Sequence, residues 1–246
     1  MILNAIILFV SALLGGLLIY VFGSDKLNIK NLLIFAGAYL FSITVIHILP
    51  ELFHMESDGF RVGLAVLGGF FFQHVLEYFT SGVEHGHMHH HPEGHSHSSL
   101  SGLSLMVALC LHAFLEGSLI AYPEVFGESH KVGSLLFGVV LHKVPAALAL
   151  MTVLSCQFSS HRTTFVLLLL FALSSPLGLL FGSYLEPLGL MNTGGVVLLF
   201  GFVAGNFLHI STTIFIESSP DHTFGWKRTL VSLLGAGVAI LVEWMM

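Results

Sequence analysis

Apolar residues gather in eight long segments along the chain, separated by short polar breaks rich in turn-forming residues. A helix of about 20 apolar residues is long enough to cross the roughly 30 Å of hydrocarbon in a bilayer. Lipid offers the backbone no hydrogen-bond partners, so such segments are expected to be helical. The pattern predicts an all-α membrane protein with eight transmembrane helices, at residues 2–22, 31–53, 60–80, 101–122, 131–155, 163–185, 193–216 and 226–245.

Composition agrees with this class of protein. Of the 246 residues, 55% are hydrophobic and 9% are charged, whereas a soluble domain has about 25% charged residues. The first segment is too long for a signal peptide and has no basic start, so we interpret it as a spanning helix. We predict one transmembrane domain over 1–246, with a polar loop at about 81–100. The net charge of −6 offers no basic surface for nucleic acid, which leaves the lipid bilayer as the expected surrounding.

Lysine and arginine are distributed unevenly between the two sides of the predicted membrane. Inner connections of membrane proteins carry the excess of positive charge. If the N-terminus is outside, the inner connections hold five basic residues and the outer connections hold two. The count predicts that both termini are outside and that the 81–100 loop is cytoplasmic, and we expect the protein in the cell membrane. A homodimer is one alternative for its assembly, which the sequence leaves open.

The polar loop reads "VEHGHMHHHPEGHSHSS" and is rich in histidine. Clustered imidazoles in such a segment bind Zn, Ni or Cu. An engineered tag would be terminal and regular, whereas this tract is internal and irregular. We expect it to capture or sense metal, through the seven residues His85, His87, His89, His90, His91, His95 and His97.

Ionisable residues also occur in the middle of apolar segments. One at the bilayer centre costs about 2.5–3.5 kcal/mol on insertion scales, so each is a functional candidate. His112 and Glu116 are four residues apart and share one helix face, and His142 is central in the next segment. Two imidazoles and a carboxylate suit Zn²⁺, Fe²⁺, Mn²⁺ or Cd²⁺. The plainer alternative is hydrogen-bonded core histidines. We predict a metal site formed by His112, Glu116 and His142.

Four motifs resemble the ZIP family of divalent metal transporters, in the same order and over essentially the whole chain. They are "HAFLEG", "HKVPAA", "HILPE" with His47, Pro50 and Glu51, and "SSPLG" with Ser175, Pro176 and Gly178. The resemblance implies a bundle of three, two and three helices, in which inverted repeats hold helices 4 and 5 and these carry the transport site. The short match between "AGAYL" from Ala36 and "AGNFL" from Ala204 is compatible with such repeats.

The motifs depart from the family pattern in an informative way. Many members have Asn after the first motif histidine and Glu four residues after the second, where this chain has Ala113 and Ala146. These residues help to build a second metal site in members with two adjacent ions. Here Lys143 follows His142, and we expect its ammonium to stand in place of the second ion, near Glu116. The alternative is that Lys143 pairs with Glu51 or Glu217.

The resulting functional hypothesis is a transporter that carries divalent transition-metal ions into the cytoplasm by alternating access. Zn²⁺ is the first choice of ion, and Fe²⁺, Mn²⁺ and Cd²⁺ are alternatives. No resident cofactor is expected, and the chain has no P-loop for ATP. The candidate pathway residues are His47, Glu51, Asn206, His209 and Glu217.

Two other readings of the same residues stay open. An intramembrane zinc-dependent hydrolase would need a general base, but HExxH is absent. A metal sensor without transport is the third hypothesis.

His74 and Glu77 share a helix face near the predicted inner surface, where polar residues are usually just solvated.

Overall fold

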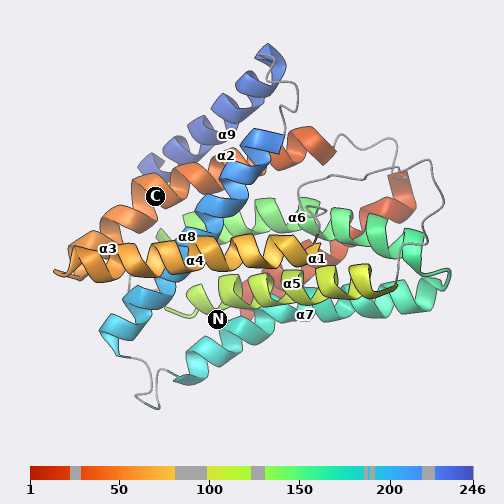
Figure 1. Ribbon diagram of the computed structural model, residues 1–246, viewed down its shortest axis with the longest axis horizontal. Coiled ribbons are helices and arrows are strands. Elements are labelled where there is room, and N and C mark those ends of the chain that lie inside the picture. The colour runs from red at the N-terminus through yellow and green to blue at the C-terminus, as the bar shows by residue number, and fades with distance from the viewer. Residues whose placement is uncertain are drawn as a thin grey trace.

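A computed structural model describes residues 1–22, 29–80, 99–122, 131–185, 188, 192–217 and 225–245. Within these ranges the regular structure is entirely helical (Figure 1). In Figure 1, α4 to α7 run along the long axis of the molecule, and α8 and α9 cross them obliquely. The helices are α1 (Ile2–Phe22), α2 (Ile29–Ile43), the π-helix η1 (Thr44–Ile48), α3 (Leu49–Met55), α4 (Gly59–Thr80), α5 (Ser99–Leu119), α6 (Lys131–Gln157), α7 (His161–Leu185), α8 (Thr193–Glu217) and α9 (Trp226–Met245).

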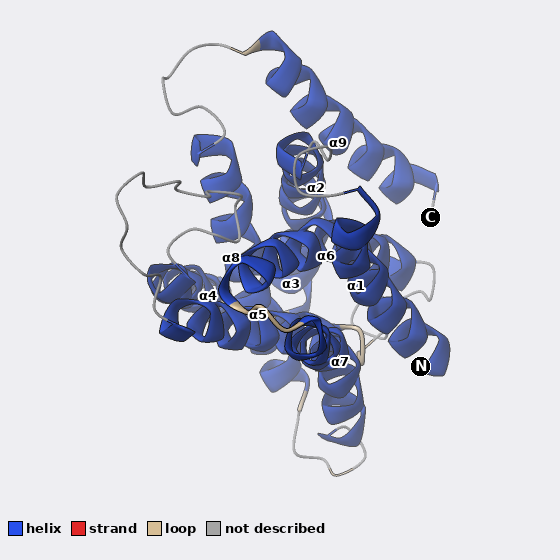
Figure 2. Ribbon diagram, turned by 90° about the vertical axis from the view of Figure 1, so that its right-hand side faces the viewer, coloured by secondary structure: helices blue, strands red, loops and turns tan. Residues whose placement is uncertain are grey.

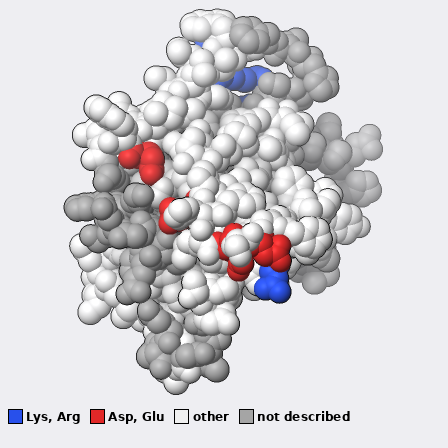
Figure 3. Space-filling view, turned by 90° about the vertical axis from the view of Figure 1, so that its left-hand side faces the viewer, with Lys and Arg blue, Asp and Glu red and all other residues white. Residues whose placement is uncertain are grey.

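The predicted all-α membrane fold is confirmed. Seven helical stretches of the described residues are long and apolar enough to cross a membrane, and α5 contributes a shorter apolar stretch at 103–119. Many large apolar side chains are exposed, among them Leu67, Leu170 and Leu233, as expected of surfaces that face lipid. Figure 3 shows a face on which charged side chains are few.

The second predicted segment differs from its expected form. It was predicted as one helix over 31–53, but α2, η1 and α3 together form a continuous span with a π turn at Thr44–Ile48. Pro50 lies two residues after this turn and has no amide hydrogen, so the regular hydrogen-bond ladder is interrupted here. π turns are frequent at functional sites. The fourth segment is also shorter than predicted, because α5 ends at Leu119 rather than at 122.

Glycines bring four helix pairs into backbone contact. A Cβ atom on Gly117 or Gly178 would collide with the opposite backbone in the α5·α7 pair, and one on Gly69 or Gly205 would do so in the α4·α8 pair. Gly15 makes the same approach between α1 and α6, and Gly235 between α9 and α2. Small residues of this kind allow membrane helices to pack closely. We call these contacts the glycine crossings.

The glycine crossings define four helix pairs, and the contacts of α1 with α7 and of α2 with α8 join these pairs into two sets of helices. Helix group A contains α1, α5, α6 and α7, and helix group B contains α2, η1, α3, α4, α8 and α9. Figure 2 shows α2 and α9 next to each other at one end of the molecule and α5 and α7 towards the other. The groups meet mainly through α2 against α6 and α4 against α5.

The helix contacts repeat in the way that inverted repeats predict. The repeats would match α1 with α7, the second span with α8, α4 with α9, and α5 with α6. Under this matching the pair α5·α7 becomes α6·α1. The pair α4·α8 likewise becomes α9·α2. All four are among the most extensive helix pairs of the described residues. The arrangement of three helices, two central helices and three helices therefore has a counterpart in the observed contacts.

Candidate metal centre

The residues predicted from the two histidine motifs lie together inside helix group A. His112 and Glu116 face the same way from α5 because they are four residues apart, and His142 comes from α6. One ligand atom from each of the three lies within 4.8 Å of the others. All three side chains are at most 5% exposed. The imidazole rings of His112 and His142 are 5.7 Å apart and nearly perpendicular.

The polar atoms in this cluster lack ordinary hydrogen-bond partners. His112 Nε2 and Glu116 Oε1 are 3.0 Å apart, yet neither atom forms a hydrogen bond of acceptable geometry, and His142 Nδ1 is also unpaired within the described residues. Buried polar atoms are nearly always paired, so exceptions of this kind call for an explanation. Imidazole nitrogens and a carboxylate oxygen that converge in this way are arranged as metal ligands are.

Lys143 lies beside the cluster and is 1% exposed. Its Nζ atom donates to Glu116 Oε2 at 3.0 Å and to Ser175 Oγ at 2.5 Å. Ser175 Oγ in turn donates to the carbonyl oxygen of Ala113 at 2.6 Å. The expected contact with Glu116 is therefore present, and the observed partner is neither Glu51 nor Glu217. The ammonium offsets the charge of the buried carboxylate and leaves its other oxygen facing His112.

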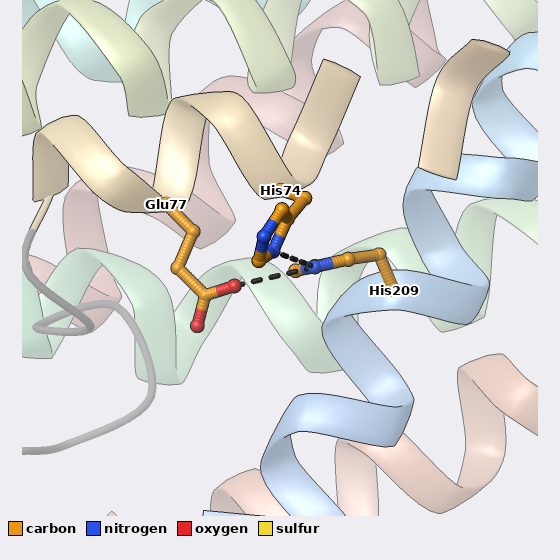
Figure 4. A group of neighbouring side chains, drawn as sticks. All are labelled: His74, Glu77 and His209. Atoms are coloured by element: carbon orange, nitrogen blue, oxygen red, sulfur yellow. Dashed lines mark hydrogen bonds and ion pairs between the residues drawn. The ribbon is translucent and has the colours of Figure 1, made fainter. Parts of the chain in front are cut away.

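A second cluster of the same composition lies between α4 and α8 of helix group B. Figure 4 shows His74 and Glu77 of α4 pointing towards His209 of α8. His209 Nε2 is 3.2 Å from His74 Nδ1 and 3.3 Å from Glu77 Oε2. His209 is buried, Glu77 is partly buried and His74 is exposed. His74 and Glu77, which sequence reasoning regarded as solvated, thus meet a candidate pathway residue.

The other candidate pathway residues lie in different places. His47, in the π turn, is buried, and its Nδ1 is 2.7 Å from Glu243 Oε1 of α9. Glu51 is partly buried on α3. Asn206 is fully buried, and within the described residues both atoms of its amide lack a hydrogen-bond partner. Glu217 ends α8, but its side chain lies outside the described residues.

The histidine-rich loop lies outside the described residues, at 81–98. The proposed role of its seven histidines therefore stays a prediction.

Sequence reasoning missed the parts played by two residues. Glu243 is the fourth residue from the end of the sequence and was not among the candidate residues, because nothing in the sequence marked it as the partner of His47. Ser175 was noted only as part of a motif, although it connects Lys143 to the α5 backbone. A hydroxyl in the middle of an apolar segment was the available signal, but such hydroxyls more often bond their own helix.

Comparison with known proteins gives a consistent assignment. The family model described as "ZIP Zinc transporter" matches residues 84–243. "Protein zntD" of Dictyostelium discoideum is 29% identical over 176 residues, which are 66% of this chain and 25% of that protein. "Zinc transporter ZIP9-B" of Xenopus laevis is 28% identical over 158 residues, which are 61% of this chain and 50% of that protein. The matched region thus spans a quarter to a half of the length of these relatives.

Proposed function

Because the chain belongs to the ZIP zinc transporter family, we propose that it moves a divalent transition-metal ion across the membrane into the cytoplasm. Zn²⁺ is the first candidate, and Fe²⁺, Mn²⁺ and Cd²⁺ are the alternatives. The observation that carries this proposal is the convergence of His112, Glu116 and His142, buried in a membrane span with one ligand atom from each within 4.8 Å of the others. The relative named "Zinc transporter ZIP9-B" supports the choice of ion.

The ligand chemistry suits reversible binding of the transported ion rather than permanent binding. A metal ligand must be deprotonated, so binding competes with protons. Three protein ligands leave a coordination position for water or for a passing fourth ligand. An ion that is to leave again must not be held by too many strong ligands. The cluster formed by His112, Glu116 and His142 meets both requirements.

Lys143 makes a single ion the expected occupancy of this site. Its ammonium already occupies one oxygen of Glu116 and would repel a second divalent ion. The place where other members hold a second ion is, on this proposal, filled by a fixed positive charge. One ion would then bind between α5 and α6 in each transport cycle.

The packing supports alternating access by movement of helix group A against helix group B. Within each group, backbones meet at the glycine crossings, where no side chain can yield. Between the groups, contacts such as that of Gly138 with the Tyr39 ring involve side chains, which can repack. Motion between groups would carry the transport site as a unit. Rigid-body rocking around a midplane site is a common transporter plan.

The hydrolase alternative has less support. Members of the ZIP family are transporters and not enzymes. Within the described residues, the charged neighbour of the His112 cluster is Lys143, whose ammonium is bonded to Glu116. A protonated lysine does not act as the general base that a zinc hydrolase needs.

Orientation, membrane and assembly are further parts of the proposal. The distribution of basic residues supports both termini outside, and we propose the cell membrane as the location. A homodimer is the proposed assembly state if the protein is not a monomer. Labelling of a cysteine introduced at either terminus of the chain, in intact cells, would test the orientation. Cross-linking in the membrane would test the assembly.

Uptake of ⁶⁵Zn²⁺ into proteoliposomes tests the function directly. We expect uptake by the full chain and its loss in His112→Ala and in Glu116→Ala, with His161→Ala, an exposed residue of α7, as the matched control. Retained uptake in both site variants would remove the site assignment. Competition by Fe²⁺, Mn²⁺ and Cd²⁺ then ranks the ions.

A further inference from the structure

We propose that His74, Glu77 and His209 form a second metal site that binds one divalent transition-metal ion between α4 and α8. The spacing of the ligand atoms is the first argument. Zn–N and Zn–O distances of about 2.0–2.1 Å put neighbouring ligands of a tetrahedral ion about 3.3–3.4 Å apart. His209 Nε2 lies 3.2 Å from His74 Nδ1 and 3.3 Å from Glu77 Oε2. Two of the three distances are therefore at ligand spacing before any ion is added, and one ligand atom from each residue lies within 4.8 Å of the others (Figure 4).

Protonation is the second argument. His209 Nε2 faces two neighbours, and a ring nitrogen carries either a proton or a lone pair. If it carries the proton, that single proton must be shared between His74 and Glu77 at long distances. If it carries the lone pair, His74 Nδ1 can donate to it, but the lone pairs of Glu77 Oε2 then face it without a proton. A cation between the three atoms removes this conflict, because all three can then offer lone pairs to it.

The ligand types indicate which ions would bind. Two imidazoles and one carboxylate suit Zn²⁺, Co²⁺, Ni²⁺ and Fe²⁺ better than Ca²⁺ or Mg²⁺, which prefer oxygen ligands. Three ligands leave one position open. His74 is exposed, so this position lies at the surface of helix group B rather than in its interior.

The site is separate from the His112 cluster, although α8 lies near both. Phe207 packs its ring edge against His112, with ring centres 6.4 Å apart. His209 is two residues further, about 200° around the helix, and its ring meets Phe70 and His74 of α4 at 4.8 Å and 5.3 Å. The two sides of α8 thus serve different clusters.

The helix packing holds the second site in place. Gly205 lies one helical turn before His209, and there the α8 backbone touches the α4 backbone at Val66. This glycine crossing fixes the separation of the two helices close to the ligands. All three ligands belong to helix group B, so the site persists whether or not helix group A moves.

Metal binding to the full chain in detergent tests the proposal. In one background His112 and His142 are replaced by alanine and the seven loop histidines by serine, which removes the imidazoles of the transport site and of the loop. Equilibrium dialysis with Zn²⁺ and the visible absorption of bound Co²⁺ are then measured. We expect one ion per chain. His74→Ala and Glu77→Gln, both outside the buried core, should weaken binding at least about 100-fold, because even outer-shell changes cost 10–100-fold. His161→Ala is the matched control.

A second background keeps His112 and His142 and replaces only the loop histidines. There we expect the number of bound ions to fall by one in the His74→Ala/Glu77→Gln variant. Absence of an ion in the first background, with native helicity and a monodisperse elution profile, would overturn the second site. Unchanged binding in His74→Ala/Glu77→Gln would overturn it as well. Neither result affects the proposed transport function, which depends on uptake by the unaltered chain.

Discussion

The two clusters each consist of two histidines and one glutamate, but their surroundings differ. In helix group A, His112, Glu116 and His142 are almost fully buried, and a lysine occupies one carboxylate oxygen. In helix group B, His209 is buried but His74 is exposed at the edge of the molecule. The spacing along the chain also differs, with histidine and glutamate four residues apart on α5 and three apart on α4.

This difference indicates that ligand identity alone does not determine what such a cluster can do. A buried cluster can exchange its ion only if the helices around it move. A cluster at the surface of its helix group does not depend on such a movement. The lysine adds a second distinction, because a buried carboxylate without a partner charge is strongly unfavourable. The following predictions compare the two clusters directly.

The largest difference is expected in stability. Glu116→Ala leaves the ammonium of Lys143 buried without its carboxylate, which should lower the free energy of unfolding by about 3–5 kcal/mol. Glu77→Ala removes a partly exposed group and should lower it by about 1 kcal/mol or less. Unfolding in detergent, followed by circular dichroism, measures both. In the double variant Glu116→Ala/Lys143→Met most of the lost free energy of unfolding should be regained. A loss as large as in Glu116→Ala would contradict the pairing.

Transport should separate the clusters next. His112→Ala should lower the initial rate of Zn²⁺ uptake into proteoliposomes by at least about 100-fold, because a direct ligand matters more than the outer-shell groups that cost 10–100-fold. His74→Ala should change this rate by less than about threefold, because its ligand set is outside the transport site. Equal losses in both variants would mean that the second cluster is an obligatory step of the pathway.

Enlarging the glycines at the helix crossings should affect one cluster at a time. Gly178→Ala forces α7 away from α5, and Gly205→Ala forces α8 away from α4; each should cost about 1–3 kcal/mol, as overpacking does. The first should lower uptake by displacing Ser175, and the second should weaken Co²⁺ binding at His209. Gly63→Ala and Gly237→Ala are controls with open space around the added methyl group. Destabilisation by the controls to the same extent would contradict close packing as the cause.

The smallest effect is expected for the hydroxyl beside the lysine. Ser175→Ala removes one acceptor of Lys143 and one donor to the Ala113 carbonyl, which should cost about 1–2 kcal/mol. Thermal unfolding measures the change. The matched variant Ser183→Ala removes a hydroxyl that bonds only its own helix, and it should cost less.

The helices could be predicted well from the sequence because hydropathy and length determine them. The predicted segment 2–22 and the helix Ile2–Phe22 coincide, and 226–245 coincides with Trp226–Met245. The π turn at Thr44–Ile48 could not be predicted in the same way. Pro50 signals an irregularity in its helix, but where the ladder widens depends on the packing of α2 and α3 against α8.

The candidate sites were predictable only as far as their members share a helix. His112 with Glu116 and His74 with Glu77 follow from helical spacing, and the two motifs added His142. The meeting of His209 with α4, and of His47 with Glu243, depends on which helices are neighbours. Similarly, three carboxylates were available as partners of Lys143, and the fold selects Glu116.

Each backbone-to-backbone glycine crossing in the described residues joins helices of the same group, and each cluster lies wholly within one group. On the proposed mechanism, each cluster therefore moves with its own helix group. If a paramagnetic ion is bound in each cluster, motion inside one helix group would leave the distance between the ions unchanged. Motion of one helix group relative to the other would change this distance. The distance between the two bound ions would thus differ between the inward-facing and outward-facing states of the cycle.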